Sequence, residues 1–515
     1  MASPLKTLAG HSAQYFSGRA AGIALGMISF PVFTRVFSVA EYGTMSLVLQ
    51  IAGLGAVASK LGIQNSVQRF YEEYLRDSGE AGSRRFHSTF LTGIIAIAAA
   101  VTLLFVVGLA AMPVSLVSDG LKKLLLLTSS LIFLRGVQSI LLGFYRAARR
   151  TTAFNFIEVS GKGATIGLTI FLVLFWNRSV EACLIGTVAV EALAALICIG
   201  VLIRDGKLSI REFDSVLFRA SLAFGVPLAA TEFANVLLHS GDRIIIAYFA
   251  GAEGVGYYSA AYTIASYMTE SLMYPASFAL MPIYMHIWVT QGKEKTQAFL
   301  SEAMNGFAIL AFLILAGTAA VSHDAITFLG SAKLAAAAPL LPPLMLGLML
   351  FTFHIFLNAG LLLCKKTFEL ARTVGISAVV NLSLNVILLP LLGLKGAALA
   401  ILISYIVMIV LLSRASAKVL PLRVDVRRWI HCFVAAAAGV AAAQPFRFES
   451  SFLSLLVRGS VCVLTYVVVL FALNRALRLS VFRWANESIA AYRSRSANPD
   501  CSAEAPQDEP AAQAQ

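Results

Sequence analysis

The sequence predicts an all-α polytopic membrane protein with about 14 transmembrane helices. Of its 515 residues 58% are hydrophobic and 13% are charged, which leaves too little polar surface for a water-soluble globule. Mean hydropathy is +0.80. The apolar stretches are continuous rather than alternating, which favours helices over barrel strands. The expected helices are 11–33, 42–61, 90–112, 121–144, 154–176, 182–203, 217–239, 256–281, 299–321, 341–363, 371–391, 396–412, 430–443 and 452–473.

Basic residues assign the two sides of the membrane. With the N-terminus in the cytoplasm, roughly 27 of the 40 Lys and Arg fall in cytoplasmic loops and roughly 8 on the far side. The positive-inside rule therefore predicts cytoplasmic N- and C-termini. These loops, facing anionic lipid, account for the net charge of +13 without nucleic acid. The first apolar run is too long for a cleaved signal and is expected to act as a signal anchor.

Two halves of the chain echo one another, which predicts a duplication. Phe37 begins FSVAEYG before the second helix, and Phe249 begins FAGAEGVGY before the eighth, about 212 residues later. A basic segment before Phe154 matches one before Phe368 at about 214 residues. Ser46 and Ser259 follow the first pair of anchors. A capping box and turn glycines explain each motif locally, but they do not explain the matched spacing.

The duplication gives the domain prediction. We expect an N-terminal six-helix lobe at 1–215, a parallel C-terminal six-helix lobe at 216–420 and an appended helix pair at 421–480. The segment 481–515 is rich in Pro, Ala, Gln and Glu and is predicted to be a largely disordered cytoplasmic tail. Parallel repeats of this kind are typical of transporters with a central site between the lobes.

Several of these motifs resemble one known family. Helix one and its exit, the segment GIQNSVQRFY at 62–71 and the pairs Asp242-Arg243 and Tyr257-Tyr258 are similar to the polysaccharide-biosynthesis (Wzx-type) flippases. That family belongs to the multidrug/oligosaccharidyl-lipid/polysaccharide exporter superfamily. The resemblance implies translocation of an undecaprenyl-pyrophosphate-linked oligosaccharide across a bacterial inner membrane, as in O-antigen, lipopolysaccharide, capsule or exopolysaccharide biosynthesis. The motifs that carry it are Tyr15, Arg19, Pro31-x-x-Thr34-Arg35, Phe37-Ser38-x-x-Glu41-Tyr42-Gly43 and those above.

Cations inside the predicted helices are candidates for the pyrophosphate site. Charged residues in hydrocarbon are costly and usually face a cavity or a partner, and Arg presents a fork of donors to phosphate. Arg19, Arg135 and Lys162 are therefore predicted to hold the headgroup in the N-terminal lobe. Two alternatives stay open: Arg19 can snorkel to the cytoplasmic headgroups, and Lys162 can pair with Glu158, four residues away on one helix face.

Other polar groups within the helices are candidates for sugar contacts and ion coupling. Amides, hydroxyls and imidazoles can bond sugar hydroxyls or merely a neighbouring helix. Carboxylates are candidates for coupling to H⁺ or Na⁺, although Asp242 can instead form a helix-terminal ion pair with Arg243. The candidates for cavity polar groups are Gln14, Tyr15, Asn235, His354, Asn358, Asn381 and Asn385, and those for ion coupling are Glu158, Glu232, Asp242 and Glu270.

Catalysis and cofactors are not expected. No loop is long enough to form a soluble catalytic domain, no P-loop is present and the six cysteines show no metal-ligand spacing. We expect a flippase that works by alternating access. Its expected partners are its lipid-linked glycan, membrane lipid, and a glycan polymerase with its chain-length machinery. The alternative is an H⁺- or Na⁺-coupled multidrug or metabolite antiporter of the same superfamily, and a third class is a scaffolding membrane protein.

Overall fold

The computed structural model describes residues 4–113, 117–209, 212–475 and 478, with side chains except at 4–17, 75–81, 274 and 278. The predicted tail at 481–515 lies outside the described residues. The described part contains helices and no strand. The helices are α1 (Pro4–Val36), α2 (Val39–Lys60), α3 (Ile63–Ala111), α4 (Asp119–Ala147), α5 (Thr151–Phe175), α6 (Val180–Arg204), α7 (Ser215–Ser240), α8 (Asp242–Ala325), α9 (Leu341–Thr352), α10 (His354–Leu363), α11 (Thr367–Leu392), α12 (Leu394–Ala417), α13 (Val426–Ala443) and α14 (Ser451–Leu473).

The structure is an all-α polytopic membrane protein, as predicted. Within the described residues, ten helical stretches are long and apolar enough to cross a membrane, and one of them, 215–330, runs through α7 and α8. Each expected apolar stretch lies within a helical segment or extends past it by one residue, including the short one at α13. The stretch 341–363 is divided between α9 and α10. Apolar side chains such as Leu104, Phe175 and Val468 are exposed, which fits helices that face lipid.

Two helices differ from the expectation in length. The expected loop between the second and third helices is helical, because α3 begins at Ile63 rather than near residue 90. α8 runs for 84 residues and covers two expected helices, which are separated at Gly292 (φ 80°). Gly251 (φ 66°) makes a second break, and both positions need the left-handed backbone that glycine adopts readily.

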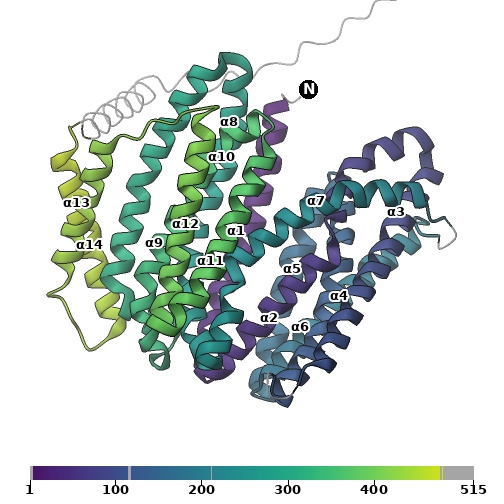
Figure 1. The fold of residues 1–515 in the computed structure, drawn as a ribbon, viewed down its shortest axis with the longest axis horizontal. Helices are drawn as coiled ribbons and strands as arrows, with labels where there is room; N and C mark the ends of the chain where they lie inside the picture. Colours follow the sequence, from purple (N-terminus) through teal and green to yellow (C-terminus); the bar gives the residue numbers. More distant parts are fainter. Residues whose placement is uncertain (1–3, 114–116, 210–211, 476–477, 479–515) are drawn as a thin grey trace, which may run out of the picture.

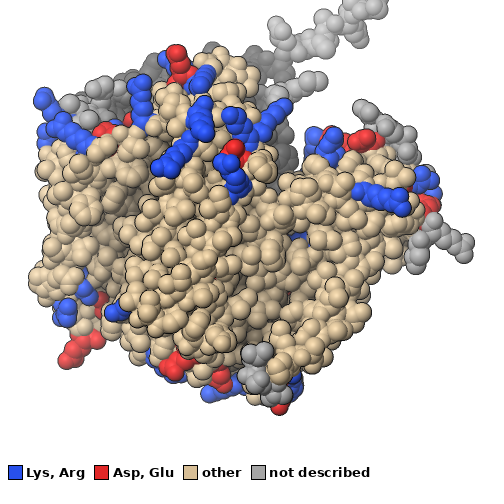
Figure 2. Space-filling model, viewed as in Figure 1, with Lys and Arg blue, Asp and Glu red and all other residues tan. Residues whose placement is uncertain are grey.

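The helices form two groups joined by α7. In Figure 1, α2 to α6 lie on the right and α8 to α14 on the left, and α7 runs obliquely between them. α7 begins against α3, where Ser66 Oγ donates to Ser221 O at 2.8 Å, and ends next to α8. Lys and Arg gather mainly along the upper edge of this view, which we call the basic end (Figure 2). The grouping is compatible with the two predicted lobes.

The two groups meet at the end of the molecule opposite the basic end. Ser38 and Glu41 form the expected capping box at the start of α2. A few residues on, a Cβ built on Gly43 would lie 1.9 Å from Ala252 O, and one on Gly256 would lie 2.2 Å from Val39 O. Ser46 Oγ donates to Ser259 Oγ at 2.8 Å, 213 residues away in sequence. We call this backbone-to-backbone approach of α2 and α8 the outer contact.

The outer contact joins residues at equivalent places in the predicted repeat. Ser46 and Ser259 are 213 residues apart, and at the same spacing Val39 corresponds to Ala252 and Gly43 to Gly256. The close approaches of Gly43 to Ala252 and of Gly256 to Val39 are therefore reciprocal. Reciprocal contacts of this kind arise where two related units meet on a twofold axis. The pairing is compatible with the predicted duplication.

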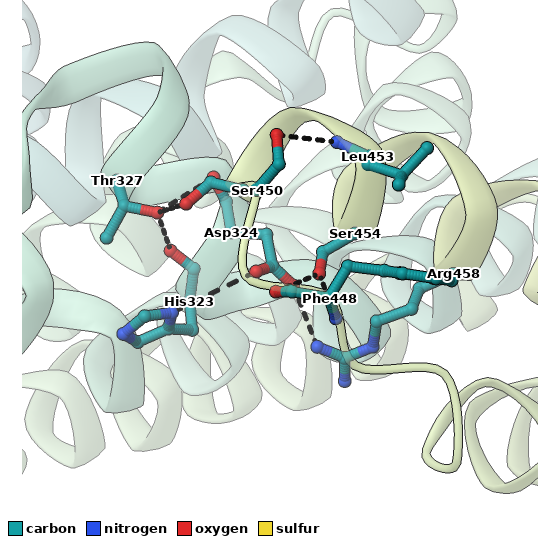
Figure 3. Close-up of polar contacts among 9 residues, drawn as sticks. His323, Asp324, Thr327, Phe448, Ser450, Leu453, Ser454 and Arg458 are labelled. Atoms are coloured by element: carbon teal, nitrogen blue, oxygen red, sulfur yellow. Dashed lines mark hydrogen bonds and ion pairs between the residues drawn. The ribbon is translucent and has the colours of Figure 1, made fainter.

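A buried ion pair attaches the last helix. Arg458 Nη1 on α14 donates to Asp324 Oδ2 at 2.7 Å, and the two side chains are 11% and 9% exposed. Figure 3 shows the pair beside the loop that leads into α14, where Thr327 Oγ1 also donates to Ser451 Oγ at 3.0 Å. α13 and α14 pack on α8, with Tyr466 donating to Ile309 O. The appended helices are thus tied to the second group.

We expect the double substitution Ser46→Cys and Ser259→Cys to form a disulfide under mild oxidation, because the two hydroxyl oxygens already lie in contact. Cleavage at a protease site engineered after Gly206 would produce two fragments. A non-reducing denaturing gel shows whether the disulfide still joins them. Ser46→Cys with Ser266→Cys is the matched control and should stay separable. Equal cross-linking of both pairs would contradict the outer contact.

We expect Asp324→Asn to lower the free energy of unfolding by about 3 kcal/mol, because it leaves a nearly buried guanidinium without its carboxylate. Unfolding of the purified protein in a series of SDS concentrations measures the loss. Asp205→Asn removes an exposed pairing with Lys207 and should cost under about 1 kcal/mol. Similar losses for the two variants would show that the buried pair is not what holds α14.

Candidate functional site

Two adjoining cavities lie in the first group of helices. The first has a volume of about 480 Å³ and is lined by α1, α2, α4, α5 and α6 and by Tyr267 of α8. The second has a volume of about 540 Å³ and is lined by the end of α2, the start of α3, α4 and Glu232 of α7. We call them the cation cavity and the amide cavity after the side chains described below. Arg135, Gln138, Leu142 and Arg146 line both.

These four shared residues lie on one face of α4. Their spacing of three, four and four residues repeats about once per helical turn, so all four point in one direction. α4 ends at Ala147, and Arg146 is therefore in its last turn, at the basic end. The shared wall of the two cavities thus runs from Arg135 in mid-helix to Arg146 at the helix end.

Arg135 is held by a carboxylate but keeps donors free. Its Nε donates to both carboxylate oxygens of Glu191 on α6, at 3.1 and 3.3 Å. The side chains are 27% and 15% exposed. Among the described residues its two terminal nitrogens have no hydrogen-bond partner, and they are not buried. Glu191 therefore orients the guanidinium while both terminal NH₂ groups face the cavity.

Arg146 lines both cavities, although it was not among the site residues predicted from the sequence. Its guanidinium carbon lies 4.6 Å from the centre of the Phe154 ring. No carboxylate of the described part lies within ion-pair distance of it. A stacked guanidinium keeps its in-plane donors open, so Arg146 can offer a fork of donors to an anion.

Lys162 enters the cation cavity opposite a row of glycines. Gly18, Gly22 and Gly26 recur every four residues on α1. Cβ atoms built on Gly22 and Gly26 would lie 3.1 Å from Lys162 Nζ and 2.4 Å from Tyr267 Oη. The missing side chains make the room that the ammonium and the phenol occupy. Both residues line the cation cavity, whose wall on α1 is formed by Gly26, Ser29 and Phe33.

Three further predicted residues surround Lys162. Arg19, Glu158 and Glu270 all interact with it electrostatically. Glu158 lines the cavity and is beyond ion-pair distance of Lys162, although they are four apart on α5. Glu270 interacts with Arg19 and Lys162 from α8. The cluster therefore brings cations from the first group and a carboxylate from the second to one place.

Glu232 lies in the amide cavity, in contact with the first group of helices. It accepts from Lys60 Nζ at 3.3 Å and from Gln64 Nε2 at 2.8 Å. Glu232 is on α7, and its two partners flank the turn between α2 and α3. Gly62 in that turn has φ 71° and approaches Gly225 so closely that a Cβ would lie 1.9 Å from Gly225 O. These contacts fix α7 against the first group.

Asp242 and Arg243 form a buried network in the second group. Their side chains are 0% and 3% exposed and lie 3.0 Å apart. Tyr258 Oη donates to Asp242 Oδ2, and the Arg243 guanidinium lies 4.3 Å from the centre of the Tyr262 ring. Arg243 Nη1 also donates to His239 O. The pair is therefore inside the protein, away from both cavities.

The remaining predicted polar residues do not line either cavity. Asn381 and Asn385 are fully buried, and Asn385 Nδ2 donates to Asn381 O at 2.9 Å. Asn235 Nδ2 donates to Thr231 O. His354 Nδ1 lies 2.6 Å from Phe351 O, and Asn358 Oδ1 is buried without a hydrogen-bond partner among the described residues. The side chains of Gln14 and Tyr15 lie outside the described residues.

Comparison with known proteins identifies the family. A family model described as polysaccharide biosynthesis protein matches residues 14–288, which cover α1 to α7, both cavities and the first part of α8. The chain belongs to the polysaccharide biosynthesis protein family. A comparison with curated protein sequences gives no match.

Solved structures share the fold of this family member. A lipid II flippase MurJ in an inward closed conformation aligns with a TM-score of 0.73 and 16% identity, over 90% of this chain and 99% of that one. An inward-facing MATE multidrug transporter aligns with a TM-score of 0.59 and 15% identity, over 83% and 96%. A MOP superfamily transporter from Pyrococcus furiosus aligns with a TM-score of 0.56 and 14% identity, over 80% and 95%. At these identities the likeness concerns the fold.

We expect Arg135→Gln to lower the free energy of unfolding by about 1 to 2 kcal/mol, because it leaves Glu191 in a largely apolar surrounding without its partner. The double variant Arg135→Gln and Glu191→Gln should recover most of that loss, since neither charge is then left unpaired. SDS-induced unfolding of the four proteins in the cycle measures it. A strictly additive double variant would contradict the pairing.

Proposed function

We propose that this protein is a flippase that moves an undecaprenyl-pyrophosphate-linked oligosaccharide across a bacterial inner membrane. The observation that carries the proposal is the shared wall of the two cavities, where the terminal nitrogens of Arg135 and the guanidinium of Arg146 make no hydrogen bond or ion pair within the described residues. Membership of the polysaccharide biosynthesis protein family supports a substrate of this class.

The chemistry of the cargo matches that wall. A pyrophosphate diester carries about two negative charges, and removing such charges from water costs several kcal/mol each unless donors replace the water. The proposed phosphate ligands are Arg135 and Arg146, with Lys162 and Arg19 adding positive potential from the cation cavity. Guanidinium groups suit this role because their forked donors match phosphate oxygens.

The proposed path starts at the basic end. By the positive-inside rule we propose that this end faces the cytoplasm. Cytoplasmic chain termini remain the prediction from the sequence. The headgroup enters the cavities from the inner leaflet while the prenyl chain stays in lipid. The outer contact closes the opposite end in this conformation. Parting α2 from α8 and closing the basic end would then release the headgroup on the outer side.

Ion coupling is assigned to carboxylates next to the cations. Glu158 and Glu270 interact with Lys162, so protonation or Na⁺ binding there would change the potential that the pyrophosphate meets. Glu232 and Asp242 have cationic partners in this conformation, and an H⁺ or Na⁺ would have to compete with Lys60 or Arg243 for them. We propose Glu270 as the first coupling residue to test.

An H⁺- or Na⁺-coupled antiporter is the second candidate. The MATE-like fold and the carboxylates around Lys162 favour it. Arg146 favours the flippase instead, because it has no carboxylate partner among the described residues and would repel a cationic drug. For the flippase we propose O-antigen, capsule or exopolysaccharide repeat units as cargo, and the glycan polymerase and chain-length machinery as the partners that receive them.

We expect Arg146→Gln to reduce flipping at least about tenfold, because a charge-assisted hydrogen bond to phosphate contributes about 1.5 to 3 kcal/mol. Proteoliposomes containing a labelled undecaprenyl-pyrophosphate oligosaccharide measure the rate, scored by an external glycan-modifying reagent.

Arg149→Gln is the matched control, since Arg149 is exposed, pairs with Glu72 and lines neither cavity. It should flip at the wild-type rate. Full flipping by Arg146→Gln would refute the phosphate role. Failure of the wild type to flip any pyrophosphate lipid, together with ion-driven efflux of organic cations, would favour the antiporter.

A further inference from the structure

The amide cavity holds carboxamides that the rest of the protein does not use. Asn65, Gln68 and Gln138 line it, and their side chains make no hydrogen bond to any other residue of the described part. Gln64 donates to Glu232 through Nε2, while its Oε1 is buried and has no partner within the described segments. Four amides in one cavity thus present unused donors or acceptors.

The folding of α3 explains why the amides converge. The left-handed turn at Leu61 and Gly62 ends α2 and starts α3 at Ile63. Gln64 and Gln68 are four residues apart and Asn65 is adjacent, so the first turns of α3 present one polar face. That face lies across the cavity from Gln138 and Ser139 of α4. The amides are therefore aimed at the same space from two helices.

The amide cavity is neutral away from the shared wall. Arg135 and Arg146 belong to the shared wall, and Lys60 pairs with Glu232. The other polar groups that line the cavity are neutral and can both donate and accept hydrogen bonds. Sugar hydroxyls and acetamido groups need donors and acceptors of this kind, whereas an apolar drug or an inorganic ion does not. The volume of about 540 Å³ is that of a typical ligand pocket.

We propose that the amide cavity is the subsite for the sugar attached to the pyrophosphate, with Asn65, Gln68 and Gln138 as its hydrogen-bonding residues. This proposal rests on the proposed function. A pyrophosphate bound at the shared wall by Arg135 and Arg146 has the amide cavity on one side and the cation cavity on the other. The sugar then occupies the amide side, where selectivity among glycans is set.

Two probes separate the subsite from the headgroup site. They are undecaprenyl pyrophosphate and undecaprenyl-pyrophosphate-N-acetylglucosamine, titrated against the full-length protein in nanodiscs by a fluorescence or thermophoresis readout. Gln68→Met and Asn65→Leu keep the approximate side-chain size and remove the amide, and both residues line the amide cavity but not the shared wall. Each should raise the Kd of the sugar-bearing lipid about threefold to tenfold and leave the sugar-free lipid unchanged, since a neutral hydrogen bond is lost.

A steric variant gives an independent arm. Gly53 lines the amide cavity, and a Cβ built on it meets no atom within 4 Å. Gly53→Phe should therefore fill the cavity without disturbing the helix, and should weaken binding of the sugar-bearing lipid only. Gly108→Phe is the matched control, because Gly108 also has open space around it but lines neither cavity. Gln50→Met controls for loss of an amide outside both cavities.

The outcomes distinguish this proposal from the one it rests on. Selective weakening of the sugar-bearing lipid by the amide and Gly53 variants supports the subsite, and Arg146→Gln should weaken both lipids. Tight binding of both lipids by wild type, with amide and Gly53 variants that change neither or both equally, overturns the subsite and leaves the flippase standing. Failure of wild type to bind either lipid overturns both proposals.

Discussion

The approach of α2 to α8 at the outer contact is the constraint on which the rest of the structure depends. Gly43 and Gly256 let two backbones come within van der Waals distance, where any side chain would collide with a carbonyl. Because the two groups of helices touch at this end, the polar residues near the basic end can line cavities and need not pack against one another. Both cavities lie in the first group, where Tyr267 of α8 and Glu232 of α7 complete their lining, and α7 crosses between the two groups (Figure 1).

Charge placement inside the first group follows from that geometry. Hydrocarbon tolerates an ionised side chain only beside a partner or water. Arg135 has both, because its Nε donates to Glu191 and its terminal nitrogens face the cavity. Asp242 and Arg243 satisfy the same rule by pairing with each other. The Tyr258 hydroxyl donates to Asp242, and the Tyr262 ring lies against the Arg243 guanidinium. In the first group these charges therefore lie at a cavity surface, whereas the Asp242–Arg243 pair is buried among the side chains of the second group.

Apolar run length was enough to predict the helices, while the site needed tertiary information. The fourteen stretches predict helical segments well, because twenty apolar residues leave the backbone few alternatives. Arg135 and Lys162 were predicted as cavity residues from their cost in hydrocarbon, and both line the cation cavity. Arg146 was missed because it stands beside Arg149 and Arg150 and looks like part of a loop. The available signal was its spacing of four residues from Leu142, which puts Arg146 on the same helix face. Asn381 and Asn385 could not be placed by sequence, since an amide that bonds its own helix has the same spacing as one that faces a cavity.

The pairing of Ser46 with Ser259 bears on how such a chain arises. A hydrogen bond between two residues at the same place in each repeat is what an isologous dimer interface becomes once its subunits are fused. Under the proposed duplication, a half-length ancestor with this surface would pair with its own copy before any fusion. The fused surfaces could then diverge away from the contact, whereas a side chain at Gly43 or Gly256 would collide with the backbone of the other half. A substitution at either glycine therefore disturbs both halves at once.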